Sequence, residues 1–432
     1  MSTPSRGSAP LRPGEVGRTL DVMMNGVVIG TLESPDPRRY TLTYSDEAAA
    51  LTRGLSCSLP IETGRHTGQV VSNWLAGLLP DRAEVVDRWR ATYDIKRSDP
   101  YALLWHVGQD VAGAASFVRP GDIDTSSALE PVTDEQIADR IRGIVADATA
   151  WMPFAGRGQF SLAGAQGKFA LARTEQGWAH ATGRQPTTHI FKPAIPGLPD
   201  QDLNEHMTMK LAALVGLPVA PTQVRSFAGQ RVLIVTRFDR RQAADGTWLR
   251  VHQEDTVQAR GLSMLRKFES PASRDVIEIT QLLRDEVTGD HAAEDVATFV
   301  DAVVFNWLVL GTDAHARNYS LLHSRTATRL APLYDLNSFL PYRDGRQVNL
   351  AMKIGFTERD PDKIDRESLD ELARDCRLDP VLVVERARTM AETLLHAGPG
   401  RLEESSKGWD SPLPELFADR MAEHVRACLN RL

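Results

Sequence analysis

The sequence predicts an α+β protein built from a small mixed domain, a strand-rich lobe and a helical lobe. Short apolar runs separated by glycine and proline fill residues 18–118, which we assign to the small domain. Strand-like apolar runs dominate residues 158–270, and apolar residues at three-to-four spacing dominate residues 271–432. Residues 119–157 are assigned to a linker and a helix, and residues 1–17 to a disordered tail. A strand-rich lobe followed by a helical lobe suits a ligand held in the cleft between them.

The small domain should begin with a β-hairpin. Two apolar runs within residues 20–32 flank Asn25-Gly26, a pair that favours the positive φ angles of a type I′ turn. Short helices are expected over residues 71–79 and 102–107, between glycine and proline breaks.

The segment after the small domain should contain a linker and one capped helix. Residues 121–131 are polar and rich in turn-forming residues, as expected of a linker. Thr133 and Gln136 then form the pattern of a capping box. The expected apolar face of that helix carries Ile137, Ile141, Ile144 and Val145.

The two lobes are predicted from their apolar patterns. We expect strands at 168–173, 188–192 and 231–237, and a helix at 204–215. The apolar stretch 296–311 contains Asp301 and Asn306 and is too short to span a membrane, so it should be a buried helix. A strand-like segment at 329–334 and two terminal helices at 380–396 and 414–432 complete the expected elements.

Composition narrows the class of protein. The chain has 432 residues, 42% hydrophobic and 25% charged, which is ordinary for globular domains and suggests two or three of them. Its net charge of -7 argues against a bulk electrostatic grip on nucleic acid or an anionic membrane. Three widely separated cysteines cannot build a disulfide framework, so we expect a reducing compartment and a cytoplasmic protein. No apolar signal segment and no run of 18 apolar residues occur, so no membrane partner is expected.

The strongest chemical signal follows the apolar helix, in the sequence Gly311-Thr-Asp313-Ala-His315-Ala-Arg317-Asn318. Asp313 and Asn318 are five residues apart, the interval between the base and the metal-binding asparagine of the protein-kinase catalytic loop. Asp335 ends an apolar segment seventeen residues after Asn318, where a kinase needs its second metal ligand. A lone aspartate in a loop is more often a turn residue, but this ordered set favours a two-lobed protein-kinase-like fold.

The strand-rich lobe contains residues suited to a nucleotide. Ser161 opens a loop of small residues that ends at Lys168, and small side chains let backbone N–H groups approach phosphate oxygens. Lys192 ends the next strand and could neutralise phosphates, and Glu205 could pair with it, although a strand-end lysine and a helix-start glutamate often have no such role. The apolar strand 232–239 is either a core strand or a hinge that offers backbone groups to adenine.

Two metal-based alternatives are weaker. His252-Gln-Glu-Asp255 contains metal-binding residue types, but adjacent residues of one segment rarely converge on an ion. A metal-dependent phosphohydrolase built on Asp313, His315 and Asp335 would need further ligands and a pair of metal ions.

With these motifs in order, the chain resembles the HipA-like serine/threonine kinases, the toxins of a bacterial toxin–antitoxin family. The resemblance covers residues 18–395. It includes the opening hairpin, Gly108-Gln-Asp-Val-Ala-Gly-Ala114, the loop 161–168, the strand 189–193, Arg237-Phe-Asp-Arg240, His252–Asp255, the Asp313–Asn318 loop and Tyr334-Asp335. Two positions depart from the family pattern: Thr236 stands where a glutamate is common, and Arg317 replaces the usual lysine.

The resemblance implies a role for each matching residue. Asp313 would be the catalytic base, Asn318 and Asp335 would hold Mg²⁺, and Ser161 would be the site of inhibitory autophosphorylation. Residues around the nucleotide would be Ala163, Gly164, Ala165, Gln166, Gly167, Lys168, Lys192, Thr236, Arg237, Phe238, His315, Arg317, Asn318, Tyr334 and Asp335.

The resemblance also implies partners. An ATP- and Mg²⁺-dependent kinase of this family would phosphorylate a protein such as an aminoacyl-tRNA synthetase and so halt translation. A DNA-binding helix-turn-helix antitoxin of the HipB type would restrain it, and contact with DNA would be indirect, which fits the acidic chain. The alternative is a catalytically weak, nucleotide-binding co-repressor scaffold, against which the intact set of Asp313, Asn318 and Asp335 argues.

Overall fold

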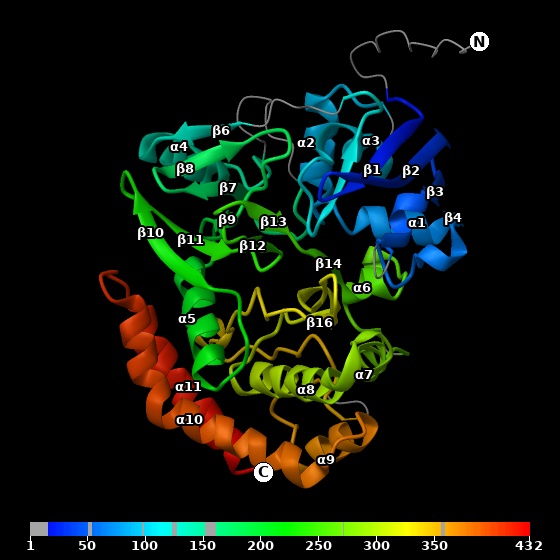
Figure 1. Cartoon of the computed structure of the whole chain (residues 1–432). Coiled ribbons are helices and arrows are strands. Elements are labelled where there is room, and N and C mark those ends of the chain that lie inside the picture. The colour runs from blue at the N-terminus through cyan, green and yellow to red at the C-terminus, as the bar shows by residue number, and fades with distance from the viewer. Residues whose placement is uncertain are drawn as a thin grey trace, which may run out of the picture.

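The structure, a computed structural model, describes residues 16–50, 54–96, 99–122, 128–151, 161–270, 272–355 and 359–432. A small mixed domain, a strand-rich lobe and a helical lobe follow one another along the chain and pack together (Figure 1). This mixed architecture agrees with the fold class that the sequence predicts. The tail expected at residues 1–17 lies outside the described residues except for Val16 and Gly17.

The small domain is a five-stranded antiparallel sheet with three short helices. The opening hairpin is confirmed: Met24 pairs with Val27, and Asn25 and Gly26 have φ angles of 49° and 86°. Both expected helices form, whereas the helix over residues 83–92 and three further strands were not foreseen. In sheet order the strands are β4 (Arg65–Thr67), β3 (Arg39–Tyr44), β2 (Val27–Asp36), β1 (Thr19–Met24) and β5 (Ala115–Val118), and the helices are α1 (Gln69–Ala76), α2 (Ala83–Thr92) and α3 (Pro100–Val107).

The strand-rich lobe is a six-stranded antiparallel sheet. Its centre is apolar: the rings of Phe169 and Phe191 stack with centroids 4.8 Å apart, and Val232 and Ile234 of the neighbouring strand are fully buried. In sheet order the strands are β10 (Thr222–Phe227), β11 (Gln230–Thr236), β9 (His189–Lys192), β7 (Phe169–Thr174), β8 (Gly177–Ala181) and β6 (Leu129–Val132). The helices are α4 (Asp134–Ala146) and α5 (Gln201–Leu214), and a hairpin of β12 (Arg240–Gln242) and β13 (Trp248–Arg250) follows.

Two details of this lobe differ from the sequence expectation. Leu129–Val132, at the end of the expected linker, pairs with β8 and forms the edge of the sheet, because extended backbone there can complete the ladder. The capping box of Thr133 and Gln136 is confirmed, but Val145 is 45% exposed. The apolar stripe of α4 is therefore narrower than expected and excludes Val145.

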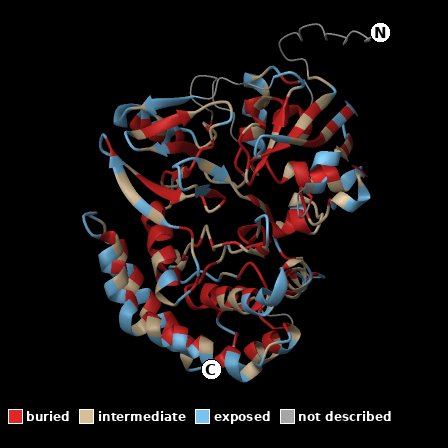
Figure 2. Ribbon diagram, viewed as in Figure 1, coloured by how far each residue is buried: buried red, intermediate tan, exposed pale blue. Residues whose placement is uncertain are grey.

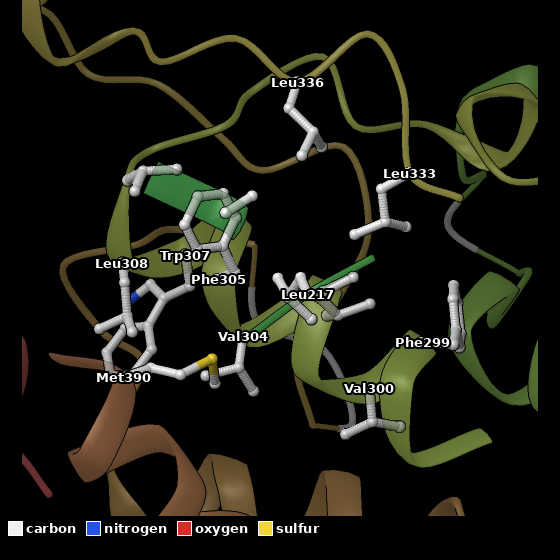
Figure 3. Close-up of a cluster of buried hydrophobic side chains, with 14 of the residues drawn as sticks. Leu217, Phe299, Val300, Val304, Phe305, Trp307, Leu308, Leu333, Leu336 and Met390 are labelled. Atoms are coloured by element: carbon white, nitrogen blue, oxygen red, sulfur yellow. The ribbon is translucent and has the colours of Figure 1, made fainter. Parts of the chain in front are cut away.

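The helical lobe is built around α8 (Ala292–Leu308), which is buried along most of its length (Figure 2). Figure 3 shows Val300, Val304 and Phe305 of this helix packed among side chains from residues 333–336 and from α10 (Pro380–Ser406). The buried helix expected over residues 296–311 is thus confirmed. The remaining elements are β14 (His252–Asp255), α6 (Thr256–Ala259), α7 (Asp275–Glu286), β15 (Ser320–His323), β16 (Thr328–Leu330), α9 (Arg366–Asp375), α10 (Pro380–Ser406) and α11 (Leu413–Leu429).

Candidate functional site

A cavity of about 550 Å³ lies between the strand-rich and helical lobes, and the small domain forms part of its wall. The structure brings together every residue that the sequence analysis assigned to catalysis, metal or nucleotide. Ser161 differs, since it does not line the cavity. The lining residues include Asp313, His315, Arg317, Asn318, Tyr334, Asp335, Thr236, Arg237, Phe238, Lys192 and the loop 163–168.

The end of α8 places the loop that carries Asp313. The backbone N–H of Gly311 donates to the carbonyl of Asn306 at 2.6 Å. A Cβ at Gly311 would lie 2.1 Å from the side-chain oxygen of Asn306, so only glycine fits this close turn. The carbonyl of Asp313 then accepts from the Nδ2 of Asn318 at 2.9 Å. This bond closes the loop and leaves the Oδ1 of Asn318 as the atom able to ligate a cation.

Asp313 is accessible from the cavity, yet its electrostatic surroundings are unusual. The protein packed around it and the negative charge of Asp335 raise the pKa of its carboxyl to about 6. A carboxylate of this kind is ionised at neutral pH and is a stronger base than an ordinary aspartate. His315 lies beside it, and burial lowers the pKa of its imidazole to about 4, so the ring is neutral.

Lys192 lies opposite the catalytic loop between two carboxylates. Its Nζ donates to Oε1 of Glu205 at 2.7 Å and to Oδ1 of Asp335 at 2.8 Å. Burial alone would lower the pKa of Lys192, but Asp335 and Glu205 raise it, so the ammonium stays charged. The pair of Lys192 and Glu205 that the sequence suggested therefore forms, with Asp335 as a third member.

Asp335 occupies a strained position at the junction of these groups. Its φ of 59° lies in the left-handed region, which costs a non-glycine residue on the order of 1 kcal/mol or more. The preceding Tyr334 donates its hydroxyl to the carbonyl of Arg317 at 2.7 Å, and its ring lies 5.3 Å from that of Phe238. Tyr334 thus connects the catalytic loop to the expected hinge.

The loop of small residues borders the cavity from the strand-rich lobe. Gly164 has a φ of 110°, and a Cβ there would lie 2.5 Å from the Nζ of Lys168. Burial, with the nearby charge of Lys192, lowers the pKa of Lys168 to about 8. Gln166 donates to the carbonyl of Pro193 at 3.0 Å, which holds the loop against the end of β9. A phosphate bound here would contact a turn that is fixed by Gln166 and that carries the positive charge of Lys168.

The expected hinge follows β11. The N–H of Thr236 donates to the carbonyl of Pro221 and that of Arg237 to the carbonyl of Thr188, so these two donors are already engaged. The guanidinium of Arg237 is bonded to Asp239 and to the carbonyl of Val111. The guanidinium of Arg237 is therefore used in contacts within the protein, and only the backbone and aliphatic part of this residue can contact a nucleotide.

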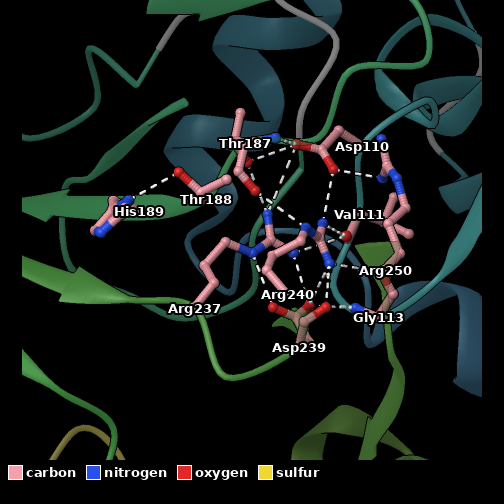
Figure 4. A network of polar contacts seen from close by, with 10 residues as sticks. All are labelled: Asp110, Val111, Gly113, Thr187, Thr188, His189, Arg237, Asp239, Arg240 and Arg250. Atoms are coloured by element: carbon pink, nitrogen blue, oxygen red, sulfur yellow. Dashed lines mark hydrogen bonds and ion pairs between the residues drawn. The ribbon is translucent and has the colours of Figure 1, made fainter. Parts of the chain in front are cut away.

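That network joins the small domain to the hinge, as Figure 4 shows. Asp110 of the small domain accepts from Arg240 at 2.8 Å and from Arg250, and Asp239 accepts from Arg237 at 2.8 Å. All five side chains are at least nine-tenths buried. Burial opposes ionisation of Asp110, but the three guanidinium groups outweigh it and hold the pKa of this carboxyl well below its usual range.

Arg317 is also engaged within the protein. Its guanidinium donates to Asp255 at 2.8 Å, to Asp81 of the small domain and to the carbonyl of Gly77 at 2.8 Å. Asp255 also caps α6. A contact between the Arg317 guanidinium and the nucleotide would require these bonds to rearrange, and the structure shows Arg317 as a link between the catalytic loop and the small domain.

Ser161 lies outside the cavity and is fully buried. Its hydroxyl donates to the carbonyl of Leu78 at 2.6 Å, and its N–H donates to the carbonyl of Asp110 at 2.9 Å. Both partners belong to the small domain, so the start of the nucleotide loop is bonded to that domain. A kinase could reach this hydroxyl only after the loop moved.

Two residues of the site, Asp81 and Lys267, carry no recognisable sequence signal. Asp81 comes from the small domain and Lys267 from a short 3₁₀ helix, Met264–Lys267, and both line the cavity. Neither belongs to a motif with fixed spacing, and their contact spans 186 residues. Proximity in the fold is therefore what identifies them.

Two parts of the chain match known protein families, and the whole chain is similar to named kinases. Residues 20–118 match the family model described as the HipA N-terminal domain, and residues 160–398 match the HipA-like C-terminal domain. The chain is 33% identical over 418 residues to Y4mE of Sinorhizobium fredii, whose name assigns it to the kinases, with 95% of this chain and 98% of that protein covered. It is 31% identical to the serine/threonine-protein kinase toxin HipA of Shewanella oneidensis, with 80% of each chain covered.

A solved structure of Shewanella oneidensis HipA, in a complex with HipB and operator DNA, has the same fold. The TM-score is 0.80 at 25% identity, and the match covers 95% of this chain and 97% of that one. Among the described residues, no helix is both long enough and apolar enough to cross a membrane.

Proposed function

The chain belongs to the HipA family of kinases, and we propose that it is an ATP- and Mg²⁺-dependent protein serine/threonine kinase that acts as a toxin in the cytoplasm. One observation carries the proposal: Asp313, Asn318 and Asp335, which have the residue types and order of a kinase catalytic loop and its second metal ligand, line a single cavity. The lysine–glutamate pair of Lys192 and Glu205 completes the arrangement from the opposite lobe.

Asp313 supplies the base of the reaction. The hydroxyl of a serine or threonine substrate attacks the γ-phosphorus, its proton passes to Asp313, and ADP leaves. A pKa of about 6 keeps Asp313 ionised at neutral pH while making it more basic than a solvated aspartate. His315 is neutral beside it and adds no charge that would weaken the base.

Asn318 and Asp335 provide the oxygen ligands that Mg²⁺ prefers. The amide nitrogen of Asn318 is bonded to the carbonyl of Asp313, and Oδ1 of Asp335 is bonded to Lys192, so Oδ1 of Asn318 and Oδ2 of Asp335 are the atoms that would hold the ion. The donor set fits Mg²⁺, which when bound would neutralise charge on the phosphates.

The strand-rich lobe would hold the nucleotide. The turn at Gly164, backed by the buried Lys168, is placed to receive phosphates, and Lys192 is charged and fixed beside it. The adenine would lie against Phe238, where the backbone donors of the two preceding residues are already used. Adenine recognition would therefore depend on the backbone carbonyl of Thr236 and on the backbone N–H and carbonyl of Phe238.

We also propose that Ser161 is an inhibitory autophosphorylation site. A phosphoserine adds about -1.5 to -2 charge and cannot occupy the buried pocket in which the hydroxyl donates to Leu78. Phosphorylation would therefore hold the nucleotide loop away from the small domain and away from the cavity.

The proposed partners follow from the family. A HipB-type helix-turn-helix antitoxin would restrain the kinase and make the contact with DNA, in keeping with the net charge of -7 on this chain. An aminoacyl-tRNA synthetase is the proposed substrate. The complex in which Shewanella oneidensis HipA was solved supports an antitoxin of this type.

The substrate can be identified by labelling. Purified protein, radiolabelled ATP and Mg²⁺ are added to a lysate of the host cell, and labelled bands are identified by mass spectrometry. A labelled synthetase, with loss of its aminoacylation activity, is the expected result. Tight ATP binding without any labelled protein would favour the alternative of a nucleotide-binding co-repressor scaffold.

A further inference from the structure

We propose that Lys267 is a further catalytic residue of the phosphoryl-transfer site and that Asp81, from the small domain, positions it. This inference rests on the proposed kinase function. Under this proposal the small domain contributes a positioning residue, Asp81, to the active site.

The segment that carries Lys267 is fixed above the catalytic loop. Lys267 ends the 3₁₀ helix Met264–Lys267 and lines the same cavity as Asp313. The ring of the next residue, Phe268, meets the ring of His315 edge-on with centroids 5.1 Å apart. The 3₁₀ helix of Lys267 is therefore packed on the catalytic loop, and the ammonium of Lys267 shares the cavity with Asp313.

Lys267 retains donors that a phosphate could use. Its Nζ donates to Oδ2 of Asp81 at 2.9 Å, and its side chain is 22% exposed. Within the described ranges of the chain, Asp81 is its only hydrogen-bond acceptor. An ammonium has three N–H groups, so two remain for the oxygens of a transferred phosphoryl group.

Three other cations around the cavity are more fully engaged, and Lys168, which donates to the carbonyl of Ala163, belongs to the nucleotide loop on the other lobe. Lys192 lies between two carboxylates, and the guanidinium of Arg317 has three protein acceptors. Arg237 belongs to the buried network behind the hinge. Beside the catalytic loop, Lys267 can therefore bind a phosphate oxygen while it keeps its bond to Asp81, whereas Arg317 would have to break a buried bond.

Asp81 connects Lys267 to the rest of the site. Its side chain is 9% exposed, and its two carboxylate oxygens contact Lys267 and Arg317. Its backbone N–H donates to the carbonyl of Gly164 in the nucleotide loop at 3.0 Å. One residue of the small domain therefore touches the nucleotide loop, the catalytic loop and the segment of Lys267.

The arrangement has a chemical consequence. As the bond between the γ-phosphorus and ADP breaks and the bond to the acceptor oxygen forms, negative charge is spread over the phosphoryl oxygens, where Lys267 can stabilise it. A lysine paired directly with Asp313 would make that carboxylate a poorer base. Because Lys267 donates to Asp81, its ammonium is held within the cavity, and the carboxylate of Asp313 stays available for the proton of the acceptor.

Kinetics of Lys267→Met, Asp81→Asn and the double variant test the proposal. Lys267→Met should lower kcat about a hundredfold, the loss typical of one transition-state donor, with the KM for ATP within about threefold of the parent value. Asp81→Asn should lower kcat about tenfold through Lys267, because Arg317 keeps its bonds to Asp255 and to the carbonyl of Gly77. The double variant should be no slower than Lys267→Met alone. Asp87→Asn, on the exposed face of α2 and paired with Arg90, is the matched control and should retain parent activity.

Binding of ADP, Mg²⁺ and aluminium fluoride, which mimics the transferred phosphoryl group, gives a second readout. Lys267→Met should weaken this complex while leaving the affinity for ADP alone unchanged. If the parent is active and the kcat of Lys267→Met lies within threefold of the parent value, the role of Lys267 is wrong while the kinase function stands. Unchanged affinity of Lys267→Met for ADP with Mg²⁺ and aluminium fluoride would lead to the same conclusion. Additive losses in the double variant would make Asp81 a structural residue only. An inactive parent would instead overturn the proposed function and this inference together.

Discussion

Replacing Asp110 by asparagine should destabilise the protein by about 3–5 kcal/mol, the usual cost of removing one member of a buried ionic cluster. The carboxylate accepts from Arg240, Arg250 and twice from Thr187, and it lies 3.6 Å from Arg237. The variant would leave three buried guanidinium groups with the single carboxylate of Asp239. It would also place an amide N–H₂ among donors.

Urea unfolding followed by far-ultraviolet circular dichroism measures this loss, with Asp122→Asn as the control. Asp122 lies just after the small domain and its side chain is 62% exposed, so its replacement should change the free energy of unfolding by less than about 0.5 kcal/mol. Adding Arg250→Gln to Asp110→Asn removes one surplus cation, so the double variant should lose at least about 1 kcal/mol less than the sum of the single variants. A loss below about 1 kcal/mol for Asp110→Asn, or strict additivity in the pair, would refute the account of the network.

Three further predictions concern the metal, the serine and pH. Asp335→Ala should weaken ATP binding at least tenfold in Mg²⁺, measured by calorimetry, because a metal ligand and one anchor of Lys192 are lost; parent-like affinity would remove Asp335 from the metal site. Ser161→Ala should keep the initial rate and escape a decline of activity during incubation with ATP, and mass spectrometry that finds no phosphate on the parent serine would exclude the switch. The rate kcat/KM should rise with pH through about 6 as Asp313 loses its proton and then level off, whereas a flat profile from pH 5 to 8 would remove Asp313 as the base.

Local signals in the sequence were sufficient for much of the fold. The hairpin at Asn25-Gly26, the capping box at Thr133 and the buried helix before Gly311 each depend on residues within a few positions of one another, and each is present. Leu129–Val132 was misassigned because this edge strand is defined by its pairing with β8, and its four residues, Leu-Glu-Pro-Val, carry no strand pattern of their own.

In the candidate site, too, residues related by a local sequence pattern were predicted, whereas contacts between distant segments were not. Asp313, Asn318 and Asp335 were predicted from their order and, for the first two, from the five-residue interval between them, and all three line one cavity. The guanidinium groups of Arg237 and Arg317 contact groups that are far away in the sequence, the carbonyl of Val111 and the carboxylate of Asp81, so these structural contacts were not foreseen. Long-range pairing of this kind has no local pattern.

The central claim is that Asp313 acts as the base of a phosphoryl transfer from ATP, and transfer of label by the parent and by Asp313→Asn tests it most directly. Purified protein is incubated with radiolabelled ATP, Mg²⁺ and host lysate, and ATP affinity is measured in parallel. The parent should label protein, and Asp313→Asn should bind ATP with parent-like affinity yet transfer at least a thousandfold more slowly, because the amide keeps the shape of the carboxylate but cannot take the proton. Near-parent transfer by Asp313→Asn, or no transfer by a parent that binds ATP, would contradict the account.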